Sequence, residues 1–212
     1  MTQSMTQDEL LALIDQAAEE GWTELDLSGE ELTELPPEIG RLTQLETLIL
    51  GKWKKNKQGN RQWKIENNRV VADVVGNLLT TLPAAIEALT RLHSLDLSGN
   101  CFSSFPTVIT ELESLKSFYA VHADLTEIPE AITQLSNLTQ LDLNNNQITE
   151  IPEAITQLSN LTQLDLNNNQ ITEIPEAITQ LSNLTQLDLN NNQITEIPEA
   201  ITQLSNLTQL DL

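Results

Sequence analysis

Aspartates recur at a fixed spacing in this chain, and a row of carboxylates can bind cations. The row consists of Asp96, Asp142, Asp165, Asp188 and Asp211. No lysine or arginine follows Lys116, and the whole chain carries a net charge of −21. On neighbouring strands of a parallel sheet such carboxylates would be about 5 Å apart and would repel each other only weakly in water. The row either keeps the array soluble, attracts a basic partner or weakly binds cations.

The basic residues are concentrated in one short segment. Of the 10 lysines and arginines, seven lie between residues 52 and 69, and the other three are Arg41, Arg91 and Lys116. The rest of the chain would repel a polyanion along its length, which argues against nucleic-acid binding.

Residue types that perform catalysis or bind metals show no recognisable spacing. His93 and His122 lie at non-equivalent positions, without a nucleophile or a metal-ligand pattern around them. Cys101 is expected to be an inert thiol at a turn, and the sequence contains no phosphate-binding G-x-x-x-x-G-K-[ST] loop. We therefore predict a protein that is not an enzyme and has no catalytic residues, metal site or cofactor.

The aspartates belong to a repeated unit that must position them. The 23-residue sequence LTQLDLNNNQITEIPEAITQLSN occurs unchanged at 138–160, 161–183 and 184–206. Alternation of Leu141 and Leu143 with polar residues predicts a strand, and Pro152 at a first helical position predicts a short helical return. Such units bury their apolar sides only by stacking on one another.

One asparagine of each unit is expected to satisfy buried backbone groups of the turns. This ladder comprises Asn100, Asn146, Asn169 and Asn192. Glu30 and Ala123 occupy the same position in two other units, which leaves the turn geometry open there but not the fold.

This pattern resembles leucine-rich repeats over nearly the whole chain. The resemblance implies an α/β fold: a curved right-handed solenoid with a parallel sheet on its concave face and short helical or 3-10 segments on its convex face. The dipeptides Leu35-Pro36, Leu82-Pro83 and Ile151-Pro152 resemble those of intracellular bacterial members. The opening helix and an insertion resemble cyanobacterial members, many from the Roco family, in which a Ras-like GTPase and a dimerising COR domain follow. Neither domain occurs in this sequence, so their nucleotide binding and dimerisation are not carried over.

The chain is expected to contain one capping helix followed by repeats. Residues 1–21 form the cap, with a capping box at Thr6–Glu9 and a helix stop at Gly21. Repeats fill residues 22–212, and the last one is incomplete at Leu212. We therefore expect a piece of a longer protein that is monomeric or associates weakly through an uncapped C-terminal edge.

An insertion at about 51–76 interrupts the repeats. We favour a hairpin-like excursion that leaves after Leu50 and returns near Asn77. The alternative is that residues 69–91 form a full unit with Ala72-Asp73-Val74 as its strand. The insertion either folds onto the solenoid flank, contacts the acidic repeats or binds a partner.

Aromatic and apolar residues that depart from the repeat mark a candidate partner site. Tyr119 and Ile49 occupy the concave position that holds Asp in most other units, and Val121 follows beside Tyr119. Trp53 and Trp63 lie in the insertion, between lysines. Exposed anchors of this kind dominate interface energetics, so we predict these five residues as partner-binding.

Signals for export and membrane insertion do not occur in the sequence. It has no apolar run of 18 residues and no secretory signal, and its single cysteine suits a reducing cytoplasm. We predict a cytoplasmic protein-interaction scaffold that belongs to a signalling protein. Its partner is expected to be a protein, and a basic one if the acidic row takes part in binding. We expect it to bind neither nucleic acid nor membrane. The alternatives are a regulatory domain acting in cis on a Roco-type GTPase, and an engineered or amplified array without a specific partner.

Overall fold

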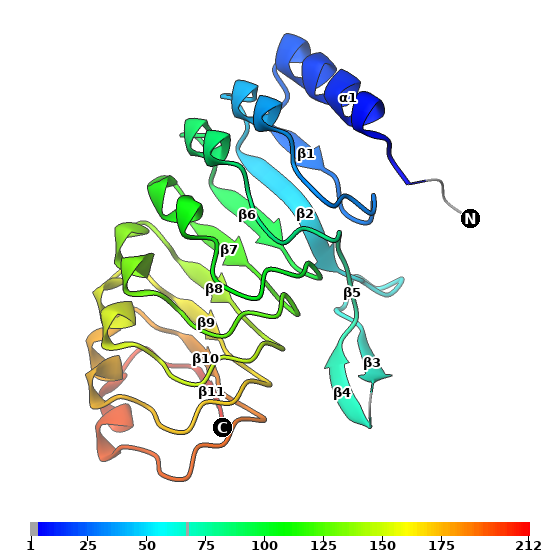
Figure 1. Cartoon of the computed structure of the whole chain (residues 1–212). Helices are drawn as coiled ribbons and strands as arrows, with labels where there is room; N and C mark the ends of the chain where they lie inside the picture. Colours follow the sequence, from blue (N-terminus) through cyan, green and yellow to red (C-terminus); the bar gives the residue numbers. More distant parts are fainter. Residues whose placement is uncertain (1–3, 67) are drawn as a thin grey trace.

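The computed structural model describes residues 4–66 and 68–212, which form a curved stack of strand-and-turn units behind one helix (Figure 1). The strands lie in one sheet in the order β1-β2-β6-β7-β8-β9-β10-β11, and all neighbours in this order are parallel. Their bounds are β1 Glu24–Asp26, β2 Thr47–Trp53, β6 Ser94–Leu97, β7 Ser117–Tyr119, β8 Gln140–Asp142, β9 Gln163–Asp165, β10 Gln186–Asp188 and β11 Gln209–Asp211. The predicted solenoid with one parallel sheet is confirmed.

Each unit returns through a short 3-10 turn on the outer side of the stack. These turns are Pro37–Arg41, Ala84–Ala88, Thr107–Glu111, Glu130–Gln134, Glu153–Gln157, Glu176–Gln180 and Glu199–Gln203. Pro152 precedes the turn in an extended conformation, with φ −66° and ψ 145°, so its prediction as a first helical residue was wrong by one position. The ring fixes φ near this value, and proline lacks the N–H that the chain would otherwise have to satisfy here.

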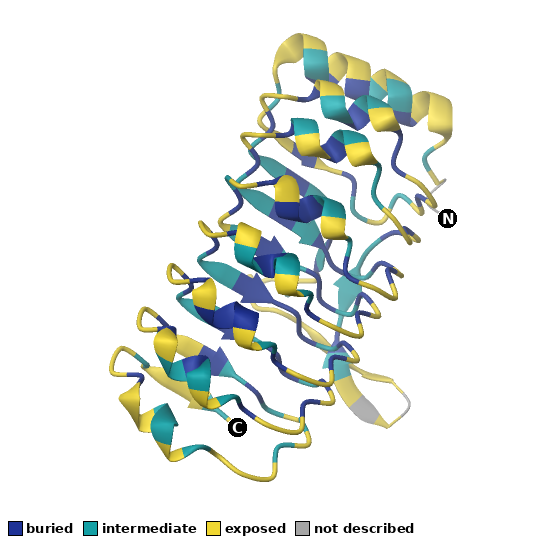
Figure 2. Cartoon of the chain, turned by 60° about the vertical axis from the view of Figure 1, so that its left-hand side comes forward, coloured by how far each residue is buried: buried dark blue, intermediate teal, exposed yellow. Residues whose placement is uncertain are grey.

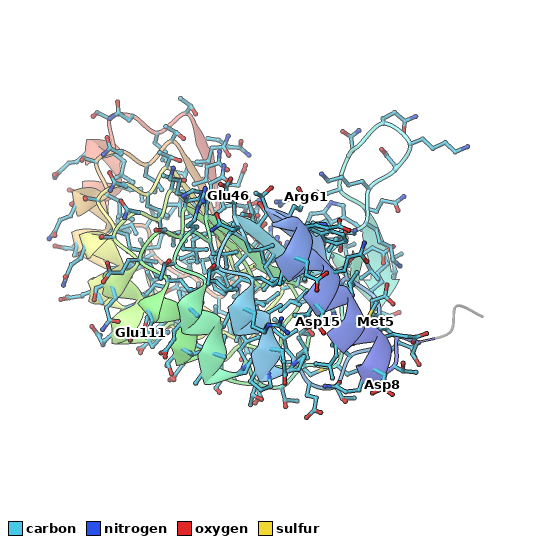
Figure 3. The ribbon with its side chains drawn as sticks, turned by 90° about the horizontal axis from the view of Figure 1, so that it is seen from above. Met5, Asp8, Asp15, Glu46, Arg61 and Glu111 are labelled. Atoms are coloured by element: carbon cyan, nitrogen blue, oxygen red, sulfur yellow. The ribbon has the colours of Figure 1, made fainter. Side chains whose placement is uncertain are left out.

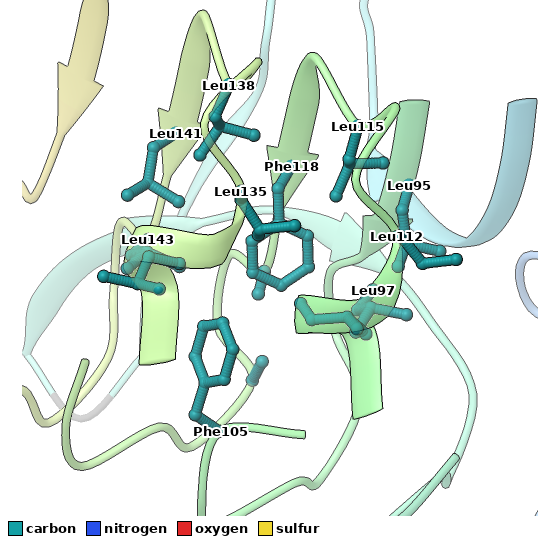
Figure 4. Close-up of a cluster of buried hydrophobic side chains, with 14 of the residues drawn as sticks. Leu95, Leu97, Phe105, Leu112, Leu115, Phe118, Leu135, Leu138, Leu141 and Leu143 are labelled. Carbon is teal, nitrogen blue, oxygen red and sulfur yellow. The ribbon is translucent and has the colours of Figure 1, made fainter. Parts of the chain in front are cut away.

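The core runs as one continuous layer between the sheet and the outer turns (Figure 2). Leucines and isoleucines are buried in it where the next unit covers the apolar side of a unit, whereas Ile197, Leu210 and Leu212 at the C-terminal edge remain exposed. Phe105 and Phe118 fill the layer beside β7, with ring centroids 5.6 Å apart and planes at 70° (Figure 4). Such an edge-to-face pair adds stabilisation beyond its buried area.

The helix α1, Gln7–Glu20, covers the first unit with the buried side chains of Leu10 and Ile14. Its capping box is present: the Glu9 N–H donates to the Thr6 hydroxyl, and the Thr6 N–H donates to the Glu9 carboxylate. Gly21 ends the helix in the left-handed region, at φ 66°. Among the described residues, no helix is long and apolar enough to cross a membrane.

Asparagine amides connect the turns of adjacent units. Asn146 donates to the carbonyls of Ala120 and Leu143, and its side-chain oxygen accepts from the N–H groups of Ala123 and Leu125. The unit that has Ala123 in place of an asparagine therefore receives its hydrogen bonds from the next unit. The turn geometry that the sequence left open there departs from that of the perfect repeats in one respect. Asp124, directly after Ala123, lies in the left-handed region at φ 61°, as Glu31 does after Glu30 at φ 58°.

The same hydrogen bonds identify one further member of the ladder, which the sequence analysis missed. Asn77 donates to the carbonyls of Leu27 and Leu50 at 2.8 and 2.7 Å and accepts from the Leu32 N–H. The second unit thus resumes its pattern at Asn77. The insertion lies between Leu50 and Asn77, and we call residues 51–76 the arm.

The arm is an excursion from the sheet. β3 (Trp63–Glu66) pairs antiparallel with β4 (Arg69–Ala72), and β5 (Val74–Val75) pairs antiparallel with the end of β2. The alternative, in which Ala72-Asp73-Val74 is a strand of the solenoid sheet, is wrong because β4 pairs outside that sheet.

Glycines form the root of the arm, where two chain segments pass close to the next turn. A Cβ on Gly51 would lie 1.6 Å from the Ser98 carbonyl oxygen, and one on Gly76 would lie 2.2 Å from the Gly99 oxygen. No other residue type fits such an approach without moving backbone.

Candidate functional site

Three backbone hydrogen bonds in a closed cycle set the shape of the arm. The Lys54 N–H donates to Asp73 O, the Asp73 N–H to Gln62 O, and the Gln62 N–H to Lys54 O. An ion pair of 2.9 Å between Lys54 Nζ and Asp73 Oδ1 reinforces the junction. Two branches leave it: a loop with its turn near Gly59, and the β3–β4 hairpin.

The arm packs back onto the solenoid through Trp53. This side chain is only 6% exposed and lies in a small apolar cluster with Ala72, Val74 and Val121. Trp63 packs edge-on against it, with ring centroids 5.0 Å apart, and remains 48% exposed. Burial of a tryptophan and a valine holds the arm against the β7 unit.

Arg61 connects the arm to the acidic row. Its Nη2 lies 2.9 Å from Asp142 Oδ2, and its Nη1 lies 3.8 Å from Asp165 Oδ2. The guanidinium also lies 4.8 Å from the ring centre of Trp53, a cation–π distance. Figure 3 shows Arg61 between the loop of the arm and the repeats.

Strand register places the aspartates in one line across the concave sheet. Asp142 pairs with Asp165, Asp165 with Asp188, and Asp188 with Asp211. Tyr119 lies between Asp96 and Asp142 in the same line, and Ile49 precedes Asp96. The line begins at Asp26, which pairs with Ile49 and forms an ion pair with Lys52 of the arm; the sequence analysis did not include Asp26 in the row.

The row is less exposed than a line of solvated charges. Burial raises the pKa of Asp96 to about 7, although hydrogen bonds from Ser98 oppose this rise. Burial and the neighbouring Asp142 charge raise the pKa of Asp165 to about 7. Burial also raises the pKa of Asp142, whose side chain is 7% exposed, while the Arg61 charge opposes the rise. Near neutral pH Asp96 and Asp165 therefore differ in charge from ordinary aspartates.

Two cavities lie on this face, and Arg61 and Tyr119 line both of them. The first, of about 730 Å³, lies between the arm and the sheet, and its lining includes Ile49, Trp53, Asp96 and Tyr119. The second, of about 260 Å³, follows the acidic row from Arg61 toward β11. We call them the arm cavity and the row cavity.

The structure brings together three of the five predicted anchors. Ile49, Trp53 and Tyr119 line the arm cavity, and Trp63 packs behind Trp53 outside that lining. Val121 was predicted as an exposed concave anchor, which is wrong: it is fully buried beneath Trp53 because the arm covers its part of the concave face.

Arg61 is a further site residue that the sequence did not single out. Its sequence signal was weak, since it is one cation among many in the arm, and its distance from Asp142 depends on how the arm folds. Within residues 4–66 and 68–212, no group of three or more His, Cys, Asp or Glu side chains could hold a metal ion.

Comparisons with known families and structures agree with this architecture. Family models described as leucine-rich repeats match residues 91–112, 113–157, 136–182 and 169–212, which together span more than half of the chain. No enzyme family is among these matches. No curated protein matches the chain significantly.

Three solved structures illustrate the similarity. A leucine-rich repeat protein from Leptospira interrogans is 34% identical with a TM-score of 0.80; the match covers 99% of this chain and 46% of that one. An internalin from Listeria monocytogenes is 27% identical with a TM-score of 0.65, covering 84% and 44%. The ectodomain of the Arabidopsis thaliana membrane receptor kinase GASSHO1/SCHENGEN3, solved in complex with CASPARIAN STRIP INTEGRITY FACTOR 2, is 31% identical with a TM-score of 0.65, covering 84% and 19%. The chain spans less than half the length of each.

Proposed function

Since the chain belongs to the leucine-rich repeat family, whose repeats are typical of protein-interaction domains, we propose that it is a non-enzymatic scaffold that binds a segment of a protein partner in the arm cavity. The observation that carries this proposal is the convergence of Ile49, Trp53 and Tyr119 on one cavity in an otherwise polar concave face. An apolar side chain and two aromatic rings in a partly desolvated cleft are the arrangement that dominates interface energetics.

The size and lining of the arm cavity favour an extended peptide segment. Its volume of about 730 Å³ lies within the roughly 300–1,000 Å³ of ligand sites that bury most of their occupant. Lys52, Lys54 and Lys55 line one side, while Asp96 lies on the sheet side. The arm cavity can therefore meet apolar side chains and both signs of charge at once. The plant receptor ectodomain named above was solved in complex with another protein factor, which supports a binding role for the repeats of this chain.

A selection experiment tests the proposal without a known partner. Peptides selected from a random peptide display library on the native chain should bind it, and Tyr119→Asp should weaken them at least about tenfold, the loss expected for a hot-spot residue. Asp stands at this strand position in the perfect repeats, so the variant should fold.

A matched control introduces the same charge elsewhere. Leu78→Asp changes a side chain that is 53% exposed and outside the arm cavity, and it should leave peptide binding unchanged. Failure to select any binder, or equal losses in both variants, would refute the proposal. Trp53→Ala is a poor test, because the buried indole also holds the arm in place.

We place this scaffold in the cytoplasm as part of a signalling protein, and we favour a basic partner because of the acidic row. Support for the cytoplasm is the single cysteine of the sequence, which suits a reducing compartment. Membership of the Roco family, a cyanobacterial type and action in cis on a GTPase stay predictions from the resemblance.

A further inference from the structure

The acidic row has a feature that a set of mobile surface carboxylates lacks: its oxygens are oriented. Asp165 Oδ1 accepts from the Asn167 backbone N–H at 3.1 Å and from the Asn144 side chain at 3.3 Å. Asp188 Oδ1 accepts from the Asn190 backbone N–H at 3.0 Å and from the Asn167 side chain at 3.4 Å. One oxygen of each carboxylate is thus used inside the solenoid, which leaves Oδ2 for other groups.

Arg61 shows what such an oxygen binds. Its Nη2 lies 2.9 Å from Oδ2 of Asp142, and its Nη1 forms a longer ion pair, of 3.8 Å, with Oδ2 of Asp165 on the adjacent strand. Adjacent strands are about 4.8 Å apart, and the planar fork of a guanidinium can span two oxygens at such a spacing. An ammonium group is a compact point charge and makes no such bridge.

The next pair of strands repeats this arrangement. Asp165 and Asp188 pair in register, belong to identical sequence units and have the same asparagine contacts. No ion pair to Asp188 occurs among the side chains that the structure describes. The row cavity extends over this pair from Arg61 at one end to Gln209 at the other.

We propose that the row cavity binds an arginine side chain of the protein partner, with its guanidinium bridging Asp165 and Asp188 as Arg61 bridges Asp142 and Asp165. The cavity volume of about 260 Å³ is below the roughly 300–1,000 Å³ of sites for whole ligands, and therefore suits one long side chain. The proposal rests on the proposed function, because the same partner would occupy both cavities. Arg61 forms the wall between them and is the internal example of the bound group.

The charges around the cavity predict how binding depends on pH. Asp142, Asp188 and Arg61 face Asp165, and the pKa of Asp165 is raised to about 7 by burial and by the Asp142 charge. A bound cation favours the ionised carboxylate, so binding must strengthen as the pH rises from 6 to 8. A contact with ordinary exposed carboxylates, fully ionised above pH 6, would not change over this range.

A labelled hexa-arginine peptide and a hexa-lysine peptide of equal charge serve as probes, with fluorescence anisotropy as the readout. The native chain should bind the arginine peptide several times more tightly than the lysine peptide, and more tightly at pH 8 than at pH 6. Asp188→Asn should weaken the arginine peptide about fivefold or more, the effect of losing one charge-assisted contact.

Asp124→Asn is the matched control, because it removes the same charge at an exposed turn outside the row. Asn tolerates the left-handed conformation at that position, φ 61° in Asp124, so the control should fold and bind as the native chain does. Equal losses in the two variants, or equal affinity for the two peptides, would reduce the effect to net charge and overturn the inference. If the arginine peptide does not bind while the binding of the selected peptides still depends on Tyr119, this inference is refuted and the proposed function remains.

Discussion

Replacing Arg61 by alanine should destabilise the protein by an amount that depends on pH. The substitution leaves Asp142, 7% exposed, without its cationic partner and removes the guanidinium from the Trp53 ring. Removing one partner of a fully buried pair costs about 3–5 kcal/mol. Arg61 is 42% exposed, so solvent screening reduces this figure, and we expect roughly 1–2 kcal/mol from the pair at pH 8.

The two contributions respond differently to acid. The cation–π contact should contribute about 0.5–1 kcal/mol at any pH. The contribution of the pair requires an ionised Asp142. Burial raises the pKa of this carboxyl even with Arg61 present, so acid protonates it sooner than an ordinary aspartate and removes charge that Arg61 compensates. Total losses of about 1.5–3 kcal/mol are expected at pH 8, and a smaller loss that approaches the cation–π contribution is expected at pH 5.

The sign of this dependence follows from linkage. Without Arg61 the folded-state pKa of Asp142 lies still further above the unfolded value, so the folded variant binds more protons than its unfolded state. Its stability must then fall as the pH rises through the folded pKa. Urea unfolding followed by circular dichroism at both pH values measures the loss.

Lys57→Ala is the control for this measurement, because it removes the same charge from an exposed position of the arm. It should change the free energy of unfolding by less than about 0.5 kcal/mol. A loss for Arg61→Ala that is no larger at pH 8 than at pH 5, or a Lys57→Ala effect of the same size, would refute the reasoning.

Three further substitutions test the arm, the ladder and the row. Gly51→Ala should lower the free energy of unfolding by more than about 3 kcal/mol or prevent folding, because its Cβ would lie 1.6 Å from the Ser98 oxygen. Gly59→Ala is the control: a Cβ there meets open space, and the cost of about 1 kcal/mol comes only from its φ of 83°. Thermal unfolding compares the two variants. Asn77→Ala should cost about 2–4 kcal/mol in urea unfolding, because it leaves buried carbonyls and an N–H unpaired; a loss under 1 kcal/mol would contradict its ladder role. Because the pKa of Asp96 is raised to about 7, the folded protein holds a proton at pH 6 that the unfolded chain has lost. The stabilisation from this proton is lost as the pH rises through the folded pKa, so the native protein should be less stable at pH 8 than at pH 6. Asp96→Asn should remove about 1 kcal/mol of that difference, and an unchanged pH profile would contradict the assignment.

Much of the fold could be predicted because the residue spacing within each unit determines its strand and its turn. The spacing of Leu141, Leu143 and Pro152 predicts strand and turn from local rules, and a register error would expose every apolar side chain of the unit. Asn77 could also have been identified as a member of the ladder. The repeat pattern stops after Leu50 and resumes at Leu78 and Leu79, and Asn77 directly precedes them. It was missed because the length of an insertion does not reveal which of its residues closes it.

The candidate site could be predicted only in part. Ile49 and Tyr119 were identifiable because their strand positions are fixed by the repeat, and they do line the arm cavity. Val121 obeys the same rule and still became buried, because a segment from another unit covers it. Pattern rules describe what a unit buries against its neighbours, and the arm adds a neighbour that the pattern does not contain.

The sequence by itself determined the stacked units, the cap and the column of aspartates, because period, polarity and strand register act within a unit and between adjacent ones. The tertiary structure decided where the arm lies, and with it the burial of Trp53, the pairing of Arg61 with Asp142 and the division of the concave face into two cavities. These contacts join residues far apart in the sequence, Arg61 with Asp142 and Trp53 with Val121, and they depend on glycine-lined backbone approaches and a single hydrogen-bonded junction. Their geometry is a property of the assembled chain, and no periodic pattern encodes it.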